Sequence, residues 1–553
     1  STTQMRSFET ADVAAMSTTQ IAALSSAQLG ATSSAQIIAL TTSQVSAIET
    51  VDLAGLNTTQ IRAIETTDIG AVSTTQLNAI STLQVTALSS TQVGALSTTQ
   101  IAGLSSVQIG ALTSAQIVAL STAQVAAIET ADLAGLSTTQ MRAFQTADIA
   151  AMNTTQIAAL SSVQIGALSS GQIAALTTAQ VAAIETTDLA GLSTAQMRAF
   201  ETADVAAFST NQLSALSSSQ LASLSSTQVG ALSTTQVAGL SSTQIGSLTS
   251  AQIVALSTAQ VAAIETADLA GLSTTQMRAF QTADIAAMNT TQIAALSSVQ
   301  IGALSSGQIA ALTTAQVAAI ETTDLAGLST AQMRAFETAD VAAFSTNQIA
   351  ALSSAQISAL TTSEVRALSS AQIAAIETVD LASMSTGQIM AIATDAIAGL
   401  TTSQIVSLTT LQISALTTSE IAVLSTANIQ ALSSAQLHAF GTDDLRALST
   451  SQILALETAD LAGLDMTQAT AFTSMQVAAM TTSQVGALVA TSPVVLDLDG
   501  NGVQTIDAQH GVQFDLNGTG VQSQVGWVSA GDGLLVMDRN HDGHINDGTE
   551  LFG

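Results

Sequence analysis

The sequence repeats with a period of eight residues, and this period constrains the fold more than any other feature. A large apolar residue recurs at residue numbers divisible by eight, from Phe8 to Leu488, which is 480 residues or sixty octads without an insertion or deletion. Thr32 is the one clear exception. We number each octad from this apolar residue, so that 96–103, with the sequence LSTTQIAG, is one complete octad. A fixed period is typical of repeat architectures, in which each unit contacts its neighbours.

Each octad carries a complete signal for the start of a helix. Positions 2 and 3 are mostly Ser or Thr, position 5 is usually Gln or Asp, position 6 is apolar, and positions 7 and 8 are mostly small. Ser or Thr followed three residues later by Gln is a capping box, and apolar residues at positions 1 and 6 have the spacing of a hydrophobic staple. The pattern predicts one short helix per octad, with its cap at position 2 or 3. Because two-turn helices are unstable alone, they must stack into a solenoid.

Two other folds compete with this interpretation. In one continuous helix the apolar stripe would drift by about 80° per octad, and Ser and Thr pairs would compete for the backbone inside the helix. A β-solenoid is the stronger alternative, because Thr, Ile and Val favour strands and the sequence TADLAG at 130–135 resembles a pentapeptide-repeat unit. The period of eight and the abundance of Ala and Gln favour helices.

Composition excludes several classes of function. The chain has 553 residues, no Cys, no Lys and a net charge of −30. Without Cys there is no disulfide framework and no thiol chemistry. Nucleic acid binding requires cations to neutralise phosphates, so we expect none, and anionic membranes are disfavoured for the same reason. Polar residues interrupt every octad, so no membrane insertion is predicted. The start has neither Met nor a signal peptide, so we expect a piece of a longer protein.

A minority of octads are acidic, with Glu at position 2 and Asp at position 5, and all eight arginines of the array occupy position 7. Some arginines lie three residues before a Glu, as Arg198 does before Glu201, where a local pair would stabilise the helix slightly. We interpret the acids as a solvated face near helix N-termini; a lateral contact or a cation site is the alternative. Six of the acidic octads form a series at intervals of seven or ten octads. These octads begin at Ile48, Ile128, Ile184, Ile264, Ile320 and Ile376.

A long block of the array occurs twice. Residues 112–212 recur identically as 248–348, a shift of 136 residues or seventeen octads. A globular enzyme core would hardly survive such a duplication, whereas a repeat array grows longer by it. The duplication therefore favours a structural role that depends on length.

The pattern weakens after Leu464, and the single proline, Pro493, marks a boundary. We expect two domains, an octapeptide-repeat solenoid at 1–488 and a small module at 489–553. The second tract is rich in Gly, Asp and Asn and contains three β-type runs, at 494–496, 512–514 and 534–536. These runs predict a β-rich module.

Three loops in this module place oxygen-bearing side chains at alternating positions with Gly at the sixth, which is the arrangement that Ca²⁺ requires. They begin at Asp497, Asp515 and Asp538. The third departs from an EF-hand loop, because Thr549 stands at its twelfth position and the acid follows one residue later. Asx turns between strands are the structural alternative. The candidate metal ligands are Asp497, Asp499, Asn501, Asp515, Asn517, Asp538, Asn540, Asp542, Asn546, Asp547 and Glu550.

The segments DLDGNGV at 497–503 and DGLLVMDRNHDGHINDGTELFG at 532–553 resemble a region of large bacterial secreted proteins of the RTX, haemolysin-type calcium-binding kind. This resemblance implies type I export, extracellular calcium and often an adhesin or surface-layer role. The glycine-rich nonapeptide of that family is missing from this sequence. The octads resemble Leu-Thr-x-x-Gln-Ile repeats of bacterial surface proteins.

These observations predict an extracellular structural protein on a bacterial cell surface, which assembles with copies of itself into a surface layer, sheath or filament. Ca²⁺ would order the C-terminal module and promote assembly. The alternatives are an adhesin stalk that binds glycan or a host surface, and an ice-binding array built on the Ser and Thr rows. We expect no enzyme, because nearly every Ser has a capping role, no phosphate-binding glycine loop is present, and zinc spacing is missing among His438, His510, His541 and His544.

Overall fold

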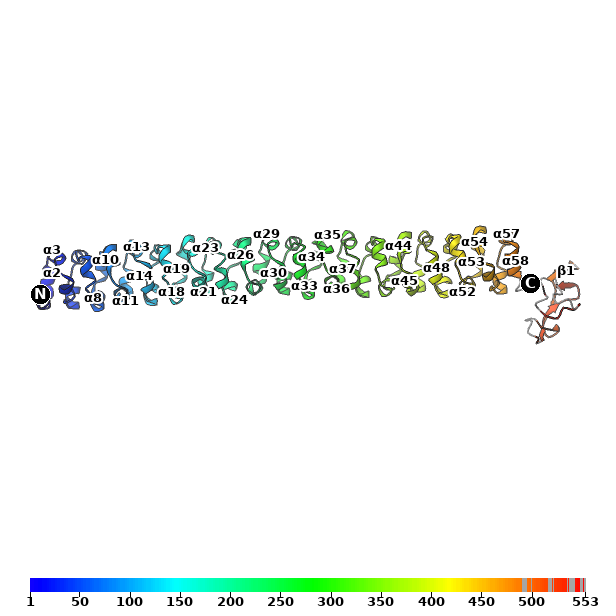
Figure 1. The fold of residues 1–553 in the computed structure, drawn as a ribbon, viewed down its shortest axis with the longest axis horizontal. Helices are drawn as coiled ribbons and strands as arrows, with labels where there is room; N and C mark the ends of the chain where they lie inside the picture. The colour runs from blue at the N-terminus through cyan, green and yellow to red at the C-terminus, as the bar shows by residue number, and fades with distance from the viewer. Residues whose placement is uncertain are drawn as a thin grey trace. The chain divides into compact units, whose positions relative to one another are not determined.

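The computed structural model describes residues 1–489, 495–498, 500–515, 520, 522–534, 536, 543–547 and 551 (Figure 1). The chain divides into two compact units, Ser1–Met288 and Asn289–Gly553. Within the described residues, 58 α-helices of four to eight residues follow one another, from α1 (Thr2–Ser7) to α58 (Thr482–Val489). The expected solenoid of short helices with a small β-rich C-terminal region is confirmed, and the β-solenoid alternative is wrong. None of the described helices is long and apolar enough to cross a membrane.

Position 2 of the octad is the helix cap, as helix α13 (Thr98–Ala102) illustrates. The backbone of Ser97 is extended, with φ −71° and ψ 160°, so the chain bends before the helix begins. The Gln100 Oε1 accepts the Ser97 N–H at 2.7 Å, and the Gln100 N–H donates to Ser97 Oγ at 3.2 Å. This reciprocal pair is the capping box expected from the sequence. It recurs in most octads because Ser or Thr and Gln recur at positions 2 and 5.

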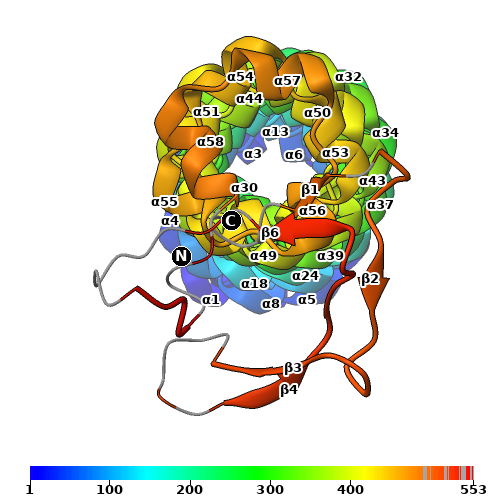
Figure 2. The ribbon, with the colours of Figure 1, turned by 90° about the vertical axis from the view of Figure 1, so that its right-hand side faces the viewer.

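The core consists of positions 1 and 6. Leu96 and Ile101 of the same octad are 4% and 0% exposed, which agrees with a hydrophobic staple whose two members both face the interior. Helices pack against the helix three octads further along, as α14 (Ser106–Ala111) does against α17 (Thr130–Leu133) in the first unit. In the second unit α54 (Thr450–Ala455) packs in the same way against α57 (Ser474–Ala479), and Figure 2 shows the last helices of that unit as a ring.

Several acidic octads have less regular helices than their neighbours. The octads that begin at Ile184, Ile264 and Ile320 form 3-10 helices, η1 (Leu189–Gly191), η2 (Asp268–Gly271) and η3 (Leu325–Gly327). The related octad at Ile128 forms the four-residue helix α17, which has no capping box. In these octads an Asp replaces Gln at position 5, and its shorter side chain is bound to the neighbouring turn instead of to its own cap. The octad at Ile376 also lacks the capping box but keeps the six-residue helix α45 (Thr378–Ser383), so the loss of the local cap does not by itself shorten the helix.

The described C-terminal strands form three antiparallel pairs: β1 (Val495–Asp497) with β6 (Asp532–Leu534), β2 (Thr505–Ile506) with β5 (Trp527–Val528), and β3 (Val512–Phe514) with β4 (Ser523–Val525). Phe514 and Trp527 contact each other with ring centroids 5.0 Å apart. The run expected at 534–536 forms its strand slightly earlier, because residues 532–534 pair with β1 while Val536 forms a separate bridge with Leu551. The division at residue 488 stays a prediction.

Candidate functional site

The first predicted calcium loop is folded around the carboxylate of Asp497, the last residue of β1. Its Oδ1 accepts the Gly500 N–H at 2.7 Å, and its Oδ2 accepts the Gly502 N–H at 3.0 Å. Both glycines have positive φ, 77° and 88°, a conformation that residues with a Cβ rarely adopt. Gly at the sixth position therefore permits the sharp turn that the sequence predicted.

The second loop repeats this arrangement. Asp515 follows β3 and is buried, and its Oδ2 accepts the N–H of Gly520, whose φ is 80°. Asp515 also forms an isolated parallel β-bridge with Asp547, near the end of the chain. The backbone therefore brings together two of the predicted ligand residues, one from the second loop and one from the segment after the third.

Asp532 is a carboxylate that sequence reasoning missed. It is 8% exposed and lies directly opposite Asp497 in the β1–β6 pair, where facing side chains are close neighbours on one face of the strands. Its Oδ2 accepts the Gln504 N–H at 2.6 Å and the Ser529 hydroxyl at 3.2 Å. Among the described residues, its Oδ1 is buried without a hydrogen-bond partner. The spacing of loop residues carried no signal for Asp532, because strand pairing alone places it beside the first loop.

These residues supply the type of donor atom that a hard cation prefers. Carboxylate oxygens of Asp497, Asp515 and Asp532, one of them without a partner, are the donor type that Ca²⁺ prefers. No group of three His, Cys, Asp or Glu side chains in metal-binding geometry occurs among the residues that the structure describes. Asn501 and Asn546 are described as well. The other predicted ligands lie outside the described residues: Asp499, Asn517, Asp538, Asn540, Asp542 and Glu550. The predicted metal set as a whole stays a prediction.

In the array, position 5 joins one turn to the next. The Gln172 side chain is buried, its Oε1 accepts the Ser169 N–H at 2.7 Å, and its Nε2 donates to the Met141 and Phe144 carbonyls, both at 2.8 Å. These two carbonyls lie 31 and 28 residues earlier in the chain. One amide therefore caps its own helix and binds the preceding turn. The capping role was predicted, whereas the second role depends on tertiary stacking.

The Asp residues of acidic octads also reach the preceding turn. The Thr42 hydroxyl donates to Asp68 Oδ1 at 2.6 Å, and the Ser434 hydroxyl donates to Asp460 Oδ1 at 2.6 Å, each across 26 residues. The pKa is raised in four carboxyl groups of this kind: Asp132, Asp188, Asp268 and Asp324. Burial is the larger cause, and the negative charge of the Glu three residues earlier is the second. A hydrogen bond from a backbone N–H of the preceding turn lowers the pKa and offsets part of this increase.

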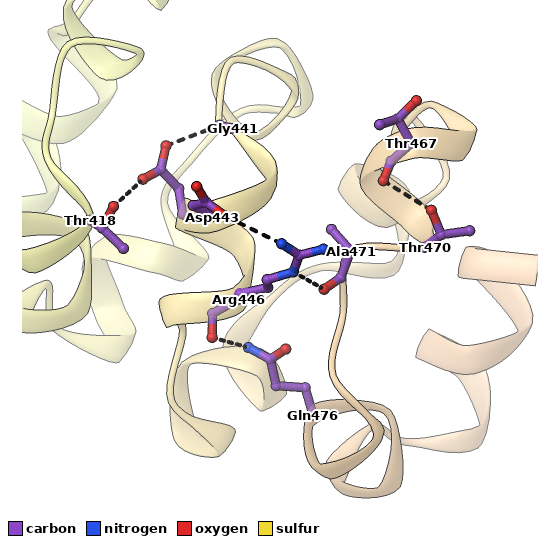
Figure 3. Close-up of polar contacts among 9 residues, drawn as sticks. Thr418, Gly441, Asp443, Arg446, Thr467, Thr470, Ala471 and Gln476 are labelled. Atoms are coloured by element: carbon purple, nitrogen blue, oxygen red, sulfur yellow. Dashed lines mark hydrogen bonds and ion pairs between the residues drawn. The ribbon is translucent and has the colours of Figure 1, made fainter.

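Arginines at position 7 donate in the opposite direction along the chain. Arg62 Nε donates to the Ala87 carbonyl at 3.2 Å, and Arg198 Nε donates to the Ser223 carbonyl at 3.1 Å, each 25 residues ahead. Figure 3 shows the same contact from Arg446 to Ala471, at 3.3 Å, together with an ion pair from Arg446 Nη1 to Asp443 at 3.2 Å. These side chains therefore link turns, a role that the expected local pairing with Glu201 did not include.

Stacked short helices, joined by buried Gln side chains, define a helical-repeat protein of the solenoid class. The chain belongs to the ALTTAQ repeat family, which matches most of the array: 5–42, 61–98, 94–122, 125–161, 141–178, 181–216, 197–234, 230–258, 261–298, 277–314, 317–354, 333–370, 373–410, 421–458, 437–474 and 453–490.

The C-terminal tract has a separate likeness. Residues 494–553 match the SPM domain. A stretch of 63 residues is 51% identical to the iron-regulated protein FrpA of Neisseria meningitidis serogroup C. This stretch covers 11% of this chain and 6% of that protein. The chain therefore spans a small part of that relative's length. The RTX resemblance itself stays a prediction.

Proposed function

We propose that this protein is an extracellular structural protein of a bacterial cell surface, which assembles with copies of itself into a layer, sheath or filament. The array supports this role because nearly every turn is built from the same contacts, so its length can change without a change of fold. The repetition of 112–212 as 248–348 is such a change of length.

The proposal includes no catalytic activity. Ser hydroxyls such as those of Ser97 and Ser169 accept the N–H of the Gln three residues on, at 3.2 Å in both cases, which is a capping contact. A nucleophilic Ser needs a general base within hydrogen-bond reach instead. Capping therefore accounts for the abundance of Ser without an enzymatic role.

Calcium is proposed to order the C-terminal module. The observation that carries this is the buried, unpartnered Oδ1 of Asp532 opposite Asp497, since two opposed carboxylates repel each other until a cation neutralises them. Asp497 and Asp532, with the predicted oxygens of the three loops, would hold the ion. Ca²⁺ that binds the folded module and not the unfolded one stabilises it by mass action. Ordering would then follow export to a calcium-rich exterior, and the ordered module would dock neighbouring copies.

Negative-stain electron microscopy of the purified chain, with calcium and with EGTA, tests the assembly. Ordered sheets or fibres that disappear in EGTA are the expected result. Single particles under both conditions would contradict the assembly and favour an adhesin stalk, the second candidate.

A matched pair of variants tests the calcium site. We expect Asp532→Asn to weaken the calcium-dependent rise of the module's unfolding temperature, because the charge is lost while the shape is kept. Asp507→Asn is the control, since Asp507 is exposed, lies outside the three loops and pairs with His510 at 2.7 Å. Equal calcium responses of both variants would remove Asp532 from the site.

A further inference from the structure

Shallow grooves recur beside the arginines of the array. One groove of about 320 Å³ is lined by Arg62 together with Thr58, Thr59, Leu83 and Thr86. A second, of about 400 Å³, is lined by Arg334 together with Ser358, Thr361, Thr362 and Ser385. In both, an Arg at position 7 faces a hydroxyl residue at position 7 of the octad three places on. The same combination therefore occurs at two independent places, one in each unit.

The guanidinium groups in these grooves retain unused donors. Arg62 uses its Nε for the Ala87 carbonyl at 3.2 Å, and in the described part of the chain its two terminal nitrogens have no acceptor. Arg334 has no side-chain acceptor among the described residues. Arg446 differs, because its Nη1 is paired with Asp443 at 3.2 Å. Each guanidinium presents two parallel terminal N–H groups, which match the two oxygens of a carboxylate. Of the two, the Arg62 guanidinium is held in place through its Nε.

The surroundings limit which carboxylates can bind. The octads before and after that of Arg62 in the sequence are acidic and expose Glu49 and Glu65, and the chain carries a net charge of −30. A densely charged polyanion would be repelled by this field. A single carboxylate on an otherwise neutral ligand avoids that repulsion, and the Ser and Thr hydroxyls of the groove suit a ligand that is itself rich in hydroxyl groups.

We propose that the grooves at Arg62 and Arg334 bind carboxylated sugar units, such as uronic acids, that are sparsely placed on neutral glycans. The guanidinium binds the carboxylate, and the groove hydroxyls bind the sugar hydroxyls. Grooves of this volume lie at the lower end of the range for small-ligand sites, so each holds one or two sugar units weakly. A glycan that reaches several grooves binds more tightly through multivalency. This binding role goes beyond the proposed calcium-dependent assembly.

Arginine-selective NMR tests the proposal on the full chain. With ¹⁵N-arginine labelling, the Nε–H signals of the nine arginines report each groove separately. The probe is a neutral oligosaccharide with one terminal glucuronic acid, and the control ligand is its methyl ester. Measurements in EGTA separate this result from calcium-dependent assembly.

We expect the acid to shift the signals of Arg62 and Arg334 and to leave Arg446 unchanged, and we expect the ester to bind about tenfold more weakly because the charge-assisted pair is lost. Arg62→Gln removes the guanidinium of the first groove, and Arg62→Lys keeps the charge without the fork. Because neither variant has an Arg62 signal, titration calorimetry measures binding of the acid, which both should bind more weakly than the original chain if circular dichroism shows that they fold, while the Arg334 signal still shifts. An equal response to acid and ester, no shift at millimolar ligand, or tighter binding of heparin would each overturn the proposal.

Discussion

At the scale of residues, the glutamine at position 5 combines local and tertiary hydrogen bonds in one buried side chain. Gln172 satisfies the Ser169 N–H of its own cap and two carbonyls of the preceding turn, and it is 2% exposed. A buried polar group left without a partner costs about 1–3 kcal/mol. The Gln row therefore makes each turn depend on the next, which explains why this polar residue occupies an interior position.

Replacing such a Gln tests this account. We expect Gln172→Met to lower the local free energy of unfolding by about 1–3 kcal/mol, because the Met141 and Phe144 carbonyls lose a donor while the volume is kept. Hydrogen exchange of the two affected turns measures the loss, since a repeat array need not unfold in two states. Gln145→Met is the control, because the Gln145 side chain donates to the Val118 carbonyl at an exposed site. Equal losses at both positions would contradict the account.

The buried aspartates make stability depend on pH. Burial raises the pKa of Asp148 and Asp284 from 3.8, against the effect of one backbone N–H. A carboxyl group with a raised folded-state pKa binds protons more readily when folded than when unfolded. Lowering the pH through the folded-state pKa toward 3.8 therefore stabilises the array, and raising it through the same window removes that stability.

We expect the thermal unfolding temperature of the array to rise as the pH is lowered from neutral toward 3.8. The double variant Asp148→Asn and Asp284→Asn should show a smaller rise, because Asn does not titrate and still offers an oxygen to the N–H of residue 145 or 281. Asp395→Asn, at an exposed position, is the control. A fall in unfolding temperature over this range would show that the sign is wrong.

At the scale of elements, pairs of glycines allow the closest approach between neighbouring turns. A Cβ added to Gly110 would lie 2.5 Å from the Gly135 carbonyl oxygen, and one added to Gly135 would overlap the Ser106 carbonyl oxygen. Both contacts involve backbone, which cannot rotate away. Gly135, at position 8 of the acidic octad that begins at Ile128, is therefore required by the close packing of neighbouring turns rather than by its backbone torsion angles.

Alanine substitution distinguishes a packing glycine from an ordinary one. We expect Gly135→Ala to destabilise its turn by about 1–3 kcal/mol, because the backbone of the preceding turn must move. Gly171→Ala is the matched control inside helix α22 (Ser170–Ala174), where the nearest atoms would lie 3.9 Å away. There we expect a gain of about 0.4–1 kcal/mol, since Ala restricts the unfolded chain. Urea unfolding with hydrogen exchange measures both, and a gain at Gly135 would refute the packing role.

At the scale of the whole molecule, the phase of the octads decides whether a change in length is tolerated. Deletion of residues 112–247 removes seventeen octads and joins residue 111 to an identical continuation at 248. We expect the shortened chain to keep its helix content per residue, since each Gln still meets carbonyls 28 and 31 residues earlier. Circular dichroism measures this directly.

A deletion that is out of phase provides the control. Removing 112–243 leaves four extra residues, half an octad, at the junction. Positions 1 and 6 on either side then no longer stack, so we expect a loss of protection from hydrogen exchange around the junction. Equal protection in both deletions would show that the phase of the repeat does not matter.

The sequence by itself determined the local structure of this protein. The apolar residue, the hydroxyl cap and the Gln three residues later define a helix start in each octad, because capping boxes and hydrophobic staples are formed by residues close together in the chain. The change of composition after Pro493 likewise predicted strands and tight Asp and Gly loops, and the Asp497 contacts to Gly500 and Gly502 are local. The sequence left the helix cap at either position 2 or position 3 of the octad, and the structure has it at position 2.

The tertiary structure alone decided which octads meet. That helices stack three octads apart, that Gln172 reaches Met141 and that Arg62 reaches Ala87 depend on how much each octad turns the chain. The eight-residue period would be the same whatever the angle by which each octad turns the chain. The period therefore does not indicate which octads pack against each other. Asp532 was missed for a related reason: its place opposite Asp497 follows from the pairing of β1 with β6, 35 residues apart, and long-range pairing is set by the free energy of the whole fold rather than by local spacing.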